Sequence, residues 1–423
     1  MEERNSDLRE RLRAALSAGM EGQFQVDDEL LTERIDAAIQ QECEKNYLDL
    51  GQRIRLRKEL YDSFRRLDIL QELVDDPDVT EIMVNGTDRI FVEKKGRILR
   101  WDRGFSSTEQ LEDLIQQVVS RVNRTVNFAS PIADARLEDG SRVHVVLPPV
   151  ALDGPTLTIR KFPEAFDMER LIFGVSITEE AADFLEKLVK AGYNIFVSGG
   201  TGSGKTTFLN ALSGFIPADE RIITIEDSAE LQIRHIPNLV RLETRAGNGE
   251  GADPVTMTDL IRASLRMRPT RIIVGEVRGS EALDMLQAMN TGHDGSLSTG
   301  HANSAADMLL RLETMVLMAA SDLPLAAVRM QIASGLDIIV HLGRLRDRSR
   351  RVLEITEVLG YEDGCIRLNP LYRFEEDAGR AGDKDMRQTP SGKTGEKEKV
   401  KGCLRRTGDL VHREKLAAAG IRL

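Results

Sequence analysis

The class of fold is indicated by the segment from Tyr193 to Thr207, which reads Tyr-Asn-Ile-Phe-Val-Ser-Gly-Gly-Thr-Gly-Ser-Gly-Lys-Thr-Thr. An apolar run leads into a glycine-rich segment, and a lysine opens the helix-like sequence that follows. The pattern G-x-x-x-x-G-K-[ST] between an expected strand and an expected helix is the context that a phosphate-binding P-loop requires. The alternative, a glycine-rich turn ahead of a helix, is disfavoured because the motif and both flanks are correct.

The P-loop predicts an ATP site. Its glycines let successive backbone N–H groups turn toward phosphate oxygens, and the helix N-terminus adds positive potential. We expect Lys205 to reach the β- and γ-phosphates and the hydroxyl of Thr206 to bind Mg²⁺. A dinucleotide site is disfavoured, because the glycines do not follow the spacing G-x-G-x-x-G and a lysine stands at the start of the helix. The expected ATP-binding residues are Gly199, Gly200, Thr201, Gly202, Ser203, Gly204, Lys205, Thr206 and Thr207.

A second apolar strand, Arg271-Ile-Ile-Val274, is followed by Gly275 and Glu276. A P-loop enzyme needs a carboxylate from a neighbouring strand beside Mg²⁺, and Glu276 is the best candidate. We expect it to hold Mg²⁺ through water, to polarise the attacking water, or both. An ordinary glutamate pKa of about 4.3 leaves it ionised at neutral pH, as either role requires. The alternative is a solvated acid after a strand.

A further pair of acids, Glu226 and Asp227, ends the strand that begins at Arg221. If the strands are parallel, this pair lies at the same sheet edge as Glu276, where open α/β sheets bind their ligands. We expect Glu226 rather than Asp227 to act in catalysis. A structural role for either acid, as a cap or in a turn, stays open.

Two of the six histidines, His293 and His301, lie within one segment rich in glycine and small hydroxyl residues. Their spacing is not a metal-binding pattern. Histidines at a strand end could hydrogen-bond a γ-phosphate, and the alternative is a pair of polar loop histidines with satisfied hydrogen bonds. The residues alone do not decide between these interpretations.

Arginines of the first domain are candidates for a role in trans. Arg136, Arg142 and Arg160 can reach the phosphate loop only if domains close or subunits pack around it, and an arginine from a neighbour would then stabilise transition-state charge. Solvated strand arginines are the alternative. The arginine-rich segment 344–351 is expected to be a charged hairpin tip, either solvated or touching anionic lipid or a partner.

The composition is typical of a soluble globular protein, with 41% hydrophobic and 30% charged residues in 423. No stretch approaches the roughly 18 apolar residues that a membrane helix needs, and the first residues lack a secretory signal. We therefore expect a cytoplasmic protein whose membrane association is peripheral. The net charge of −11 argues against nucleic acid as a partner. The three widely separated cysteines fit a reducing compartment.

Helices alternating with apolar strands after residue 177 predict an α/β domain with a largely parallel sheet between helices. Apolar spacing predicts one helix over 54–74, and strands and a hairpin at Asp139-Gly140 then predict a smaller α+β domain. The expected divisions are an N-terminal helical or partly disordered arm (1–52), an α+β domain (53–162), an interdomain linker (163–176), an ATPase domain (177–374), a charged flexible linker (375–400) and a short C-terminal helical segment (401–423).

Several motifs in a fixed order make the chain resemble the type II/type IV secretion ATPases. They are the P-loop, the acids at Glu226, Arg-Met-Arg-Pro269, Ile-Ile-Val-Gly-Glu276-Val-Arg-Gly and the histidine segment ending at His301. The first domain adds Asp134-Ala-Arg-Leu and Leu-Thr-Ile-Arg-Lys-Phe162. The likeness covers about residues 53–374, and the CpaF/TadA branch, whose members assemble Flp pili, is the most similar.

The resemblance implies a homo-hexameric ring in which a small N-terminal domain moves against a RecA-like C-terminal domain as ATP is bound and hydrolysed. It implies partners among the inner-membrane platform proteins of a pilus or secretion apparatus, at the cytoplasmic face of that membrane. By motif, Glu276 is the Walker B acid, Glu226 lies in the family's Asp box and His301 in its His box. The family's trans-acting arginines fall in the region that holds Arg142 and Arg160. Two other functions are weighed: a DNA-transfer motor, and a regulatory scaffold that hydrolyses ATP too slowly to do work.

Overall fold

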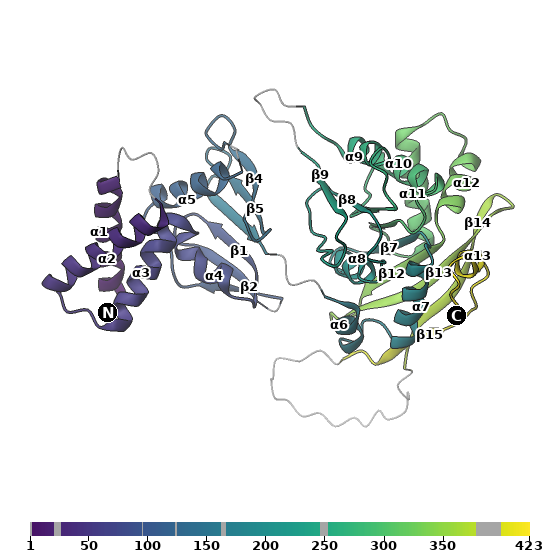
Figure 1. The fold of residues 1–423 in the computed structure, drawn as a ribbon, viewed down its shortest axis with the longest axis horizontal. Helices are drawn as coiled ribbons and strands as arrows, with labels where there is room; N and C mark the ends of the chain where they lie inside the picture. The colour runs from purple at the N-terminus through teal and green to yellow at the C-terminus, as the bar shows by residue number, and fades with distance from the viewer. Residues whose placement is uncertain are drawn as a thin grey trace, which may run out of the picture. The chain divides into compact units, whose positions relative to one another are not determined.

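The computed structural model describes residues 2–20, 27–94, 96–122, 125–161, 166–245, 253–377 and 399–423. The chain divides into two compact units, Met1–Pro163 and Glu164–Leu423, which are drawn with their elements in Figure 1. Each unit has its own hydrophobic core and is described by itself.

The first unit begins with three helices, α1 (Glu2–Met20), α2 (Asp28–Lys45) and α3 (Leu50–Arg65). They pack around fully buried apolar side chains such as Ile35 and Leu60. The expected boundary at residue 53 therefore differs from the structure, since it cuts through α3. The single helix expected over 54–74 is also interrupted: Asp68 has a positive φ of 49°, and η1 (Asp68–Leu70) and α4 (Gln71–Asp75) follow as separate turns.

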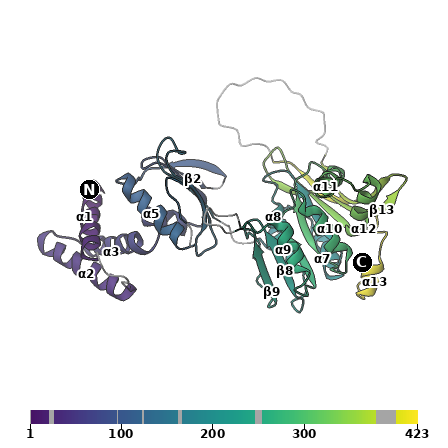
Figure 2. The same cartoon turned by 90° about the horizontal axis from the view of Figure 1, so that it is seen from above.

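A six-stranded antiparallel sheet forms the rest of the first unit, in the order β3-β2-β1-β6-β5-β4. Helix α5 (Thr108–Ser120) covers one face, as Figures 1 and 2 show, and buries Leu111 and Ile115 against the strands. The expected hairpin at Asp139-Gly140 is present between β4 and β5, with Gly140 at a φ of 89°. The strands are β1 (Val79–Asn85), β2 (Ile90–Lys94), β3 (Arg97–Trp101), β4 (Ile132–Arg136), β5 (Arg142–Val146) and β6 (Thr156–Arg160).

The second unit contains a nine-stranded sheet in the order β15-β14-β13-β12-β7-β11-β10-β8-β9. The six strands from β12 to β9 in that order are parallel, and β13, β14 and β15 add an antiparallel edge. Their bounds are β7 (Ile195–Gly199), β8 (Ile222–Glu226), β9 (Leu239–Glu243), β10 (Arg271–Val274), β11 (Leu297–Gly300), β12 (Ile338–Arg344), β13 (Arg350–Glu362), β14 (Cys365–Glu376) and β15 (Gly402–Arg406).

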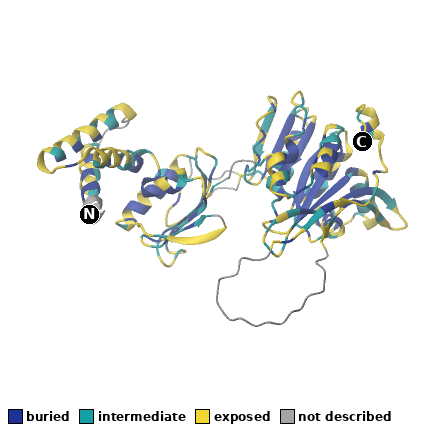
Figure 3. Ribbon diagram, turned by 90° about the horizontal axis from the view of Figure 1, so that it is seen from below, coloured by how far each residue is buried: buried dark blue, intermediate teal, exposed yellow. Residues whose placement is uncertain are grey.

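Helices cover both faces of this sheet, so the central strands are buried on both sides (Figure 3). Strand β7 shows the arrangement: Ile195 and Val197 belong to one core and Phe196 to the other. On the first face lie α6 (Met168–Phe173), α7 (Glu179–Lys190) and α8 (Lys205–Ser213), and on the second α9 (Met257–Ser264), α10 (Glu281–Asn290), α11 (Ala305–Ala319) and α12 (Leu325–Gly335). The α/β class expected from the sequence is confirmed. Among the described residues, no helix combines the length and apolarity that crossing a membrane requires.

The segment expected as an interdomain linker, 163–176, contains helix α6. Asp167 caps its N-terminus, and Met168 and Leu171 are buried in the core of the second unit. The proline and glycine residues that suggested a linker therefore flank a short packed helix. Residues 162–165 lie outside the described residues.

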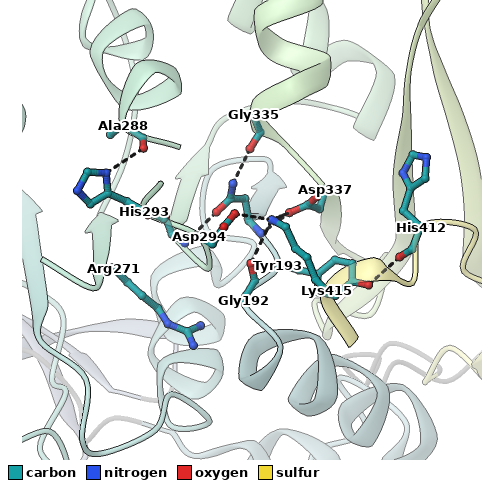
Figure 4. Close-up of polar contacts among 12 residues, drawn as sticks. Gly192, Tyr193, Arg271, Ala288, His293, Asp294, Gly335, Asp337, His412 and Lys415 are labelled. Carbon is teal, nitrogen blue, oxygen red and sulfur yellow. Dashed lines mark hydrogen bonds and ion pairs between the residues drawn. The ribbon is translucent and has the colours of Figure 1, made fainter. Parts of the chain in front are cut away.

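The C-terminal segment also differs from expectation. It adds strand β15 to the sheet by pairing with β14, and only then forms the short helix α13 (Glu414–Ala418). Lys415 fastens this end to the amino edge of the sheet, where its Nζ lies 2.8 Å from Asp294 Oδ1 and 2.7 Å from Asp337 Oδ2 (Figure 4). Strand β14 runs into the expected charged linker as far as Glu376, and residues 378–398 of that linker lie outside the described residues.

Candidate nucleotide-binding site

The predicted site residues meet at the carboxyl edge of the parallel strands. Strand β7 ends at Gly199, β8 at Glu226, and β11 at Gly300 just before His301, while Glu276 follows the end of β10 by two residues. Because these strands are parallel and adjacent in the order β7-β11-β10-β8, their ends lie side by side. This is where open α/β sheets place their ligands.

The phosphate loop is shaped by glycines at two positions where other residues would be strained. Gly202 has a φ of 71° and Gly204 a φ of 95°, both in the left-handed region that favours glycine. Gly204 caps α8 without a side-chain hydrogen bond. Among the described residues, the first N–H groups of α8 therefore have no acceptor, and they are available to a phosphate.

Lys205, His301 and Glu276 form a line of contacts across the edge. The Nζ atom of Lys205 lies 3.2 Å from Nδ1 of His301 and 3.3 Å from the carbonyl oxygen of Gly200. On its other side, His301 Nε2 lies 2.9 Å from Oε1 of Glu276, although not in the direction of a hydrogen bond. The phosphate loop is thus connected through β11 to the carboxylate that follows β10.

The charges of this group are set by burial and by one another. Burial lowers the pKa of Lys205, and burial together with Lys205 lowers the pKa of His301. Burial acts to raise the pKa of Glu276, but Arg278, His301 and Lys205 more than offset it, so that this pKa is lowered. A neutral imidazole therefore stands between an ammonium and a carboxylate at neutral pH.

Arg278 belongs to the site, although it was not among the predicted residues. Its Nη2 donates to Oε2 of Glu276 at 2.9 Å, and its Nη1 lies 3.8 Å from Asp227. The sequence could have suggested Arg278 only through its position two residues after Glu276 in the same motif. Its contact with Glu276 could not be predicted, because the contact depends on how the chain turns after β10.

Glu226 is buried at the same edge but contacts the backbone. Its Oε1 accepts hydrogen bonds from the N–H groups of Glu230 (2.8 Å) and Leu231 (3.0 Å), while Oε2 is buried and has no hydrogen-bond partner among the described residues. Burial raises the pKa of Glu226 to about 7. A Cβ at Gly275 would lie 2.8 Å from Cγ of Glu226, which explains the glycine before Glu276.

The oxygen donors at the edge fit Mg²⁺, which prefers hydroxyl, carboxylate and water oxygens. The site offers the hydroxyl of Thr206 in the first turn of α8 and the carboxylate of Glu276. Oε1 of Glu276 is buried without a hydrogen-bond partner among the described residues, as expected of an oxygen that awaits a ligand. These two residues are the ones that would hold the metal.

The two histidines whose role the sequence did not settle lie at opposite edges of the sheet. His301 lies in the site, whereas His293 precedes β11 at the opposite, amino edge of the sheet. There its Nδ1 lies 3.2 Å from the carbonyl oxygen of Ala288 (Figure 4). The second unit also holds a buried histidine that no sequence motif indicated. This is His341 on β12, whose Nδ1 lies 2.9 Å from Oγ of Ser198 on β7.

The two predicted trans-acting arginines lie in the first unit, next to each other. Arg142 on β5 stands directly opposite Arg160 on β6 and Arg136 on β4, so the three side chains share one face of the sheet. Arg142 donates to Asp134 at 3.3 Å.

Residues 65–390 match the family model described as type II/IV secretion system protein. The chain belongs to this family. A type II/IV secretion system protein with this phosphate loop, and with Glu276 beside it, is an ATPase of the secretion type. Its second unit is accordingly the RecA-like ATPase domain of the fold that the sequence predicted.

Curated relatives of this secretion-family chain carry transfer and secretion names. A putative conjugal transfer protein of Mycobacterium tuberculosis is 37% identical over 73% of this chain and 88% of its own length. Conjugal transfer protein TrbB of Rhizobium radiobacter is 34% identical over 77% of this chain and 97% of its own length. The type IV secretion system protein PtlH homolog of Bordetella bronchiseptica is 36% identical over 68% of this chain and 91% of its own length.

Solved structures similar to the chain include the VirB11 ATPase of the Brucella suis type IV secretion system, in complex with sulphate, and the pilus retraction motor PilT with bound ADP. The first is 30% identical and covers 71% of this chain and 95% of its own, with a TM-score of 0.38. The second is 20% identical, and the match covers 72% of this chain and 81% of the PilT chain, with a TM-score of 0.48.

Proposed function

We propose that this protein is a Mg²⁺-dependent motor that works as a homo-hexamer and uses ATP hydrolysis to power pilus assembly or protein secretion. One observation carries the proposal: Lys205, His301 and Glu276 form a continuous line from the phosphate loop to the ends of two neighbouring strands. A charge that arrives or leaves beside Lys205 changes the contacts of both other residues. Hydrolysis can therefore be converted into displacement of the segments that follow β10 and β11.

In this proposal each residue has a distinct task. Lys205 and the N–H groups of the loop bind the β- and γ-phosphates, and Glu276 orients the attacking water. His301 contacts the γ-phosphate from the end of β11. Thr206, and Glu276 through water, would hold Mg²⁺, which would supply positive charge to neutralise the phosphates. Glu226 positions the turn after β8 through its two backbone contacts.

The ring and its partners follow from the likeness to the family. An arginine from the first unit of a neighbouring subunit, Arg142 or Arg160, completes the site by stabilising transition-state charge. The partners are inner-membrane platform proteins of a pilus or secretion apparatus, which the motor meets at the cytoplasmic face of that membrane. We assign the chain to the CpaF/TadA branch on its motifs.

A second candidate is a DNA-transfer motor, favoured by the conjugal transfer names of two relatives. The net charge of −11 disfavours it, because nucleic-acid binding usually leaves a basic surface. Adding single- and double-stranded DNA to the ATPase assay separates the two functions. A DNA-dependent rise in turnover that falls with salt supports DNA transfer, and an unchanged rate supports pilus assembly or protein secretion.

The test is steady-state ATP hydrolysis by the full chain with Mg²⁺. Glu276→Gln should lose turnover and keep ATP binding, and Lys205→Ala should lose ATP binding. Glu243→Gln is the matched control, because it makes the same chemical change at the end of β9 on the same sheet edge. Negligible hydrolysis by the wild type would instead indicate a regulatory scaffold, and full turnover by Glu276→Gln would remove Glu276 from the mechanism.

A further inference from the structure

The hairpin between β12 and β13 carries five arginines, of which the proposed motor uses none. Two have contacts of their own: Arg346 pairs with Glu376, and Arg351 donates to the carbonyl oxygens of Val400 and Gly402. The other three, Arg344, Arg348 and Arg350, are exposed and have no acidic partner among the described residues.

The position of Arg350 follows from the register of the strands. Strand β12 lies parallel to β7 with Leu342 opposite Gly199, and Leu342 pairs with Val352 of β13. Both apolar side chains are buried in the core that α8 covers. Arg344 and Arg350 are the next pair on that face, two residues further along, because side chains alternate along a strand.

Arg350 lies against the phosphate loop itself. Its Cδ atom stands 3.4 Å from where a Cβ on Gly204 would lie, so the stem of the arginine passes the last glycine before α8. The carbonyl oxygen of Leu342 lies even closer to the loop, 2.6 Å from where a Cβ on Gly199 would be. The hairpin thus forms one wall of the loop.

The charges on this wall favour the binding of an anion. Arg344 and Arg350 stand directly opposite each other, and like charges in such a pair are destabilising. The N-terminus of α8 and Lys205 add positive potential nearby. Within the described residues nothing acidic contacts either guanidinium, so a bound phosphate is the group that would relieve the repulsion.

The order of the strands indicates which phosphate of a bound nucleotide lies beside the hairpin. Glu276 and His301 follow β10 and β11 on one side of β7, and the hairpin lies on the other side, beyond β12. A nucleotide whose γ-phosphate faces Glu276 and His301 therefore directs its α-phosphate and ribose toward the hairpin. We propose that Arg350 binds the α-phosphate of the nucleotide, with Arg344 opposite it adding positive potential. This inference rests on the proposed function, because it assumes that ATP occupies the loop.

Binding of labelled ATP and ADP to the full chain tests the assignment. Because the α-phosphate is common to both nucleotides, Arg350→Ala should weaken ATP and ADP to the same extent, by about tenfold for one charge-assisted hydrogen bond. Arg350→Lys, which keeps the charge but loses the bidentate geometry, should give an intermediate loss. Arg346→Ala is the matched control, with the same change of charge in the same hairpin, and should bind both nucleotides as the wild type does.

The possible results separate this inference from the motor. Unchanged affinity of Arg350→Ala for ADP, with Lys205→Ala unable to bind, would overturn the role of Arg350 and leave the ATP site intact. A loss of affinity for ATP but not for ADP would also overturn this role, because it would show that Arg350 contacts the γ-phosphate instead. Failure of the wild type to bind either nucleotide would overturn the proposed function itself.

Discussion

The ammonium of Lys205 and the Nδ1 atom of His301 lie 3.2 Å apart, although 96 positions of sequence separate the two residues. Since burial and Lys205 both lower the pKa of His301, the imidazole is neutral and Nδ1 accepts the hydrogen bond from the ammonium. We assign the proton to Nε2, which faces Glu276. One ring therefore touches the phosphate-binding lysine and the proposed water-orienting carboxylate.

Replacing His301 should slow ATP turnover without abolishing ATP binding. In His301→Ala we expect kcat to fall about a hundredfold, because Lys205 and Glu276 lose the residue between them, while the loop still binds phosphate. Steady-state kinetics and nucleotide binding measure the two effects. His293→Ala, at the opposite edge of the sheet, should hydrolyse ATP at the wild-type rate. Equal losses in the two variants would show a general effect on folding.

Gly275 should not tolerate a side chain. A Cβ there would lie 2.8 Å from Cγ of Glu226, so Gly275→Ala should lower the free energy of unfolding by about 1–3 kcal/mol. Gly200→Ala is the control, because a Cβ at Gly200 meets nothing within 4 Å. The readout is denaturation followed by circular dichroism, since the only tryptophan, Trp101, lies in the other unit.

The same clash predicts coupling between Gly275 and Glu226. Removing the Glu226 side chain makes room for the new methyl group, so Gly275→Ala should cost less stability in a Glu226→Ala background than in the wild type. A double-mutant cycle by denaturation measures the difference. Strictly additive effects would mean that the strand end moves to relieve the contact in another way.

Stability should depend on the ionisation of Glu226. Its pKa is about 7 in the folded protein against an ordinary value of 4.5. Between these values the unfolded chain releases a proton that the folded one keeps, so rising pH favours unfolding until both states are ionised. Glu226→Gln keeps an oxygen for Glu230 and Leu231 and should remove this dependence, stabilising the protein above pH 7 by up to about 3 kcal/mol.

Denaturation of wild type and Glu226→Gln at pH 5 and pH 8 gives the comparison. Glu230→Gln, an adjacent acid of the same turn, should keep the pH dependence of the wild type. If the wild type and Glu226→Gln lose stability equally between the two pH values, the proton is not held by Glu226.

The arginines of the first unit should act across subunits. Arg142 and Arg160 share one rung of the sheet, so either can compensate for the other and the informative variant removes both. Mixing Arg142→Ala/Arg160→Ala subunits with Lys205→Ala subunits should restore part of the ATPase rate at hybrid interfaces, where an intact loop meets an intact arginine pair. Neither variant alone should turn over, and absence of recovery in the mixture would count against action in trans.

Much of this site could be predicted from the sequence, because the signals are local. The P-loop needs a strand, a short glycine-rich loop and a helix in succession, and all are present between Ile195 and Ser213, where five residues separate β7 from α8. Glu276 was found for the same reason, since an acid that closely follows an apolar strand is visible without any knowledge of its neighbours.

Predictions that spanned more than one element were less complete. The linker expected over 163–176 and the boundary at residue 53 both fall on helices, α6 and α3, whose burial depends on distant residues. The strand β15 was missed because β14, with which it pairs, lies on the other side of the charged segment that precedes β15.

The order of residues is enough to predict that an apolar strand, a phosphate loop and a helix follow one another and that acids and histidines end nearby strands. Which of these residues meet depends on the folded chain: His301 rather than His293 contacts Lys205, Arg278 contacts Glu276, and Arg350 lies against Gly204. The reason is that local conformation follows from side-chain periodicity within a few residues, whereas contact at a sheet edge follows from the order and register of strands far apart in the chain.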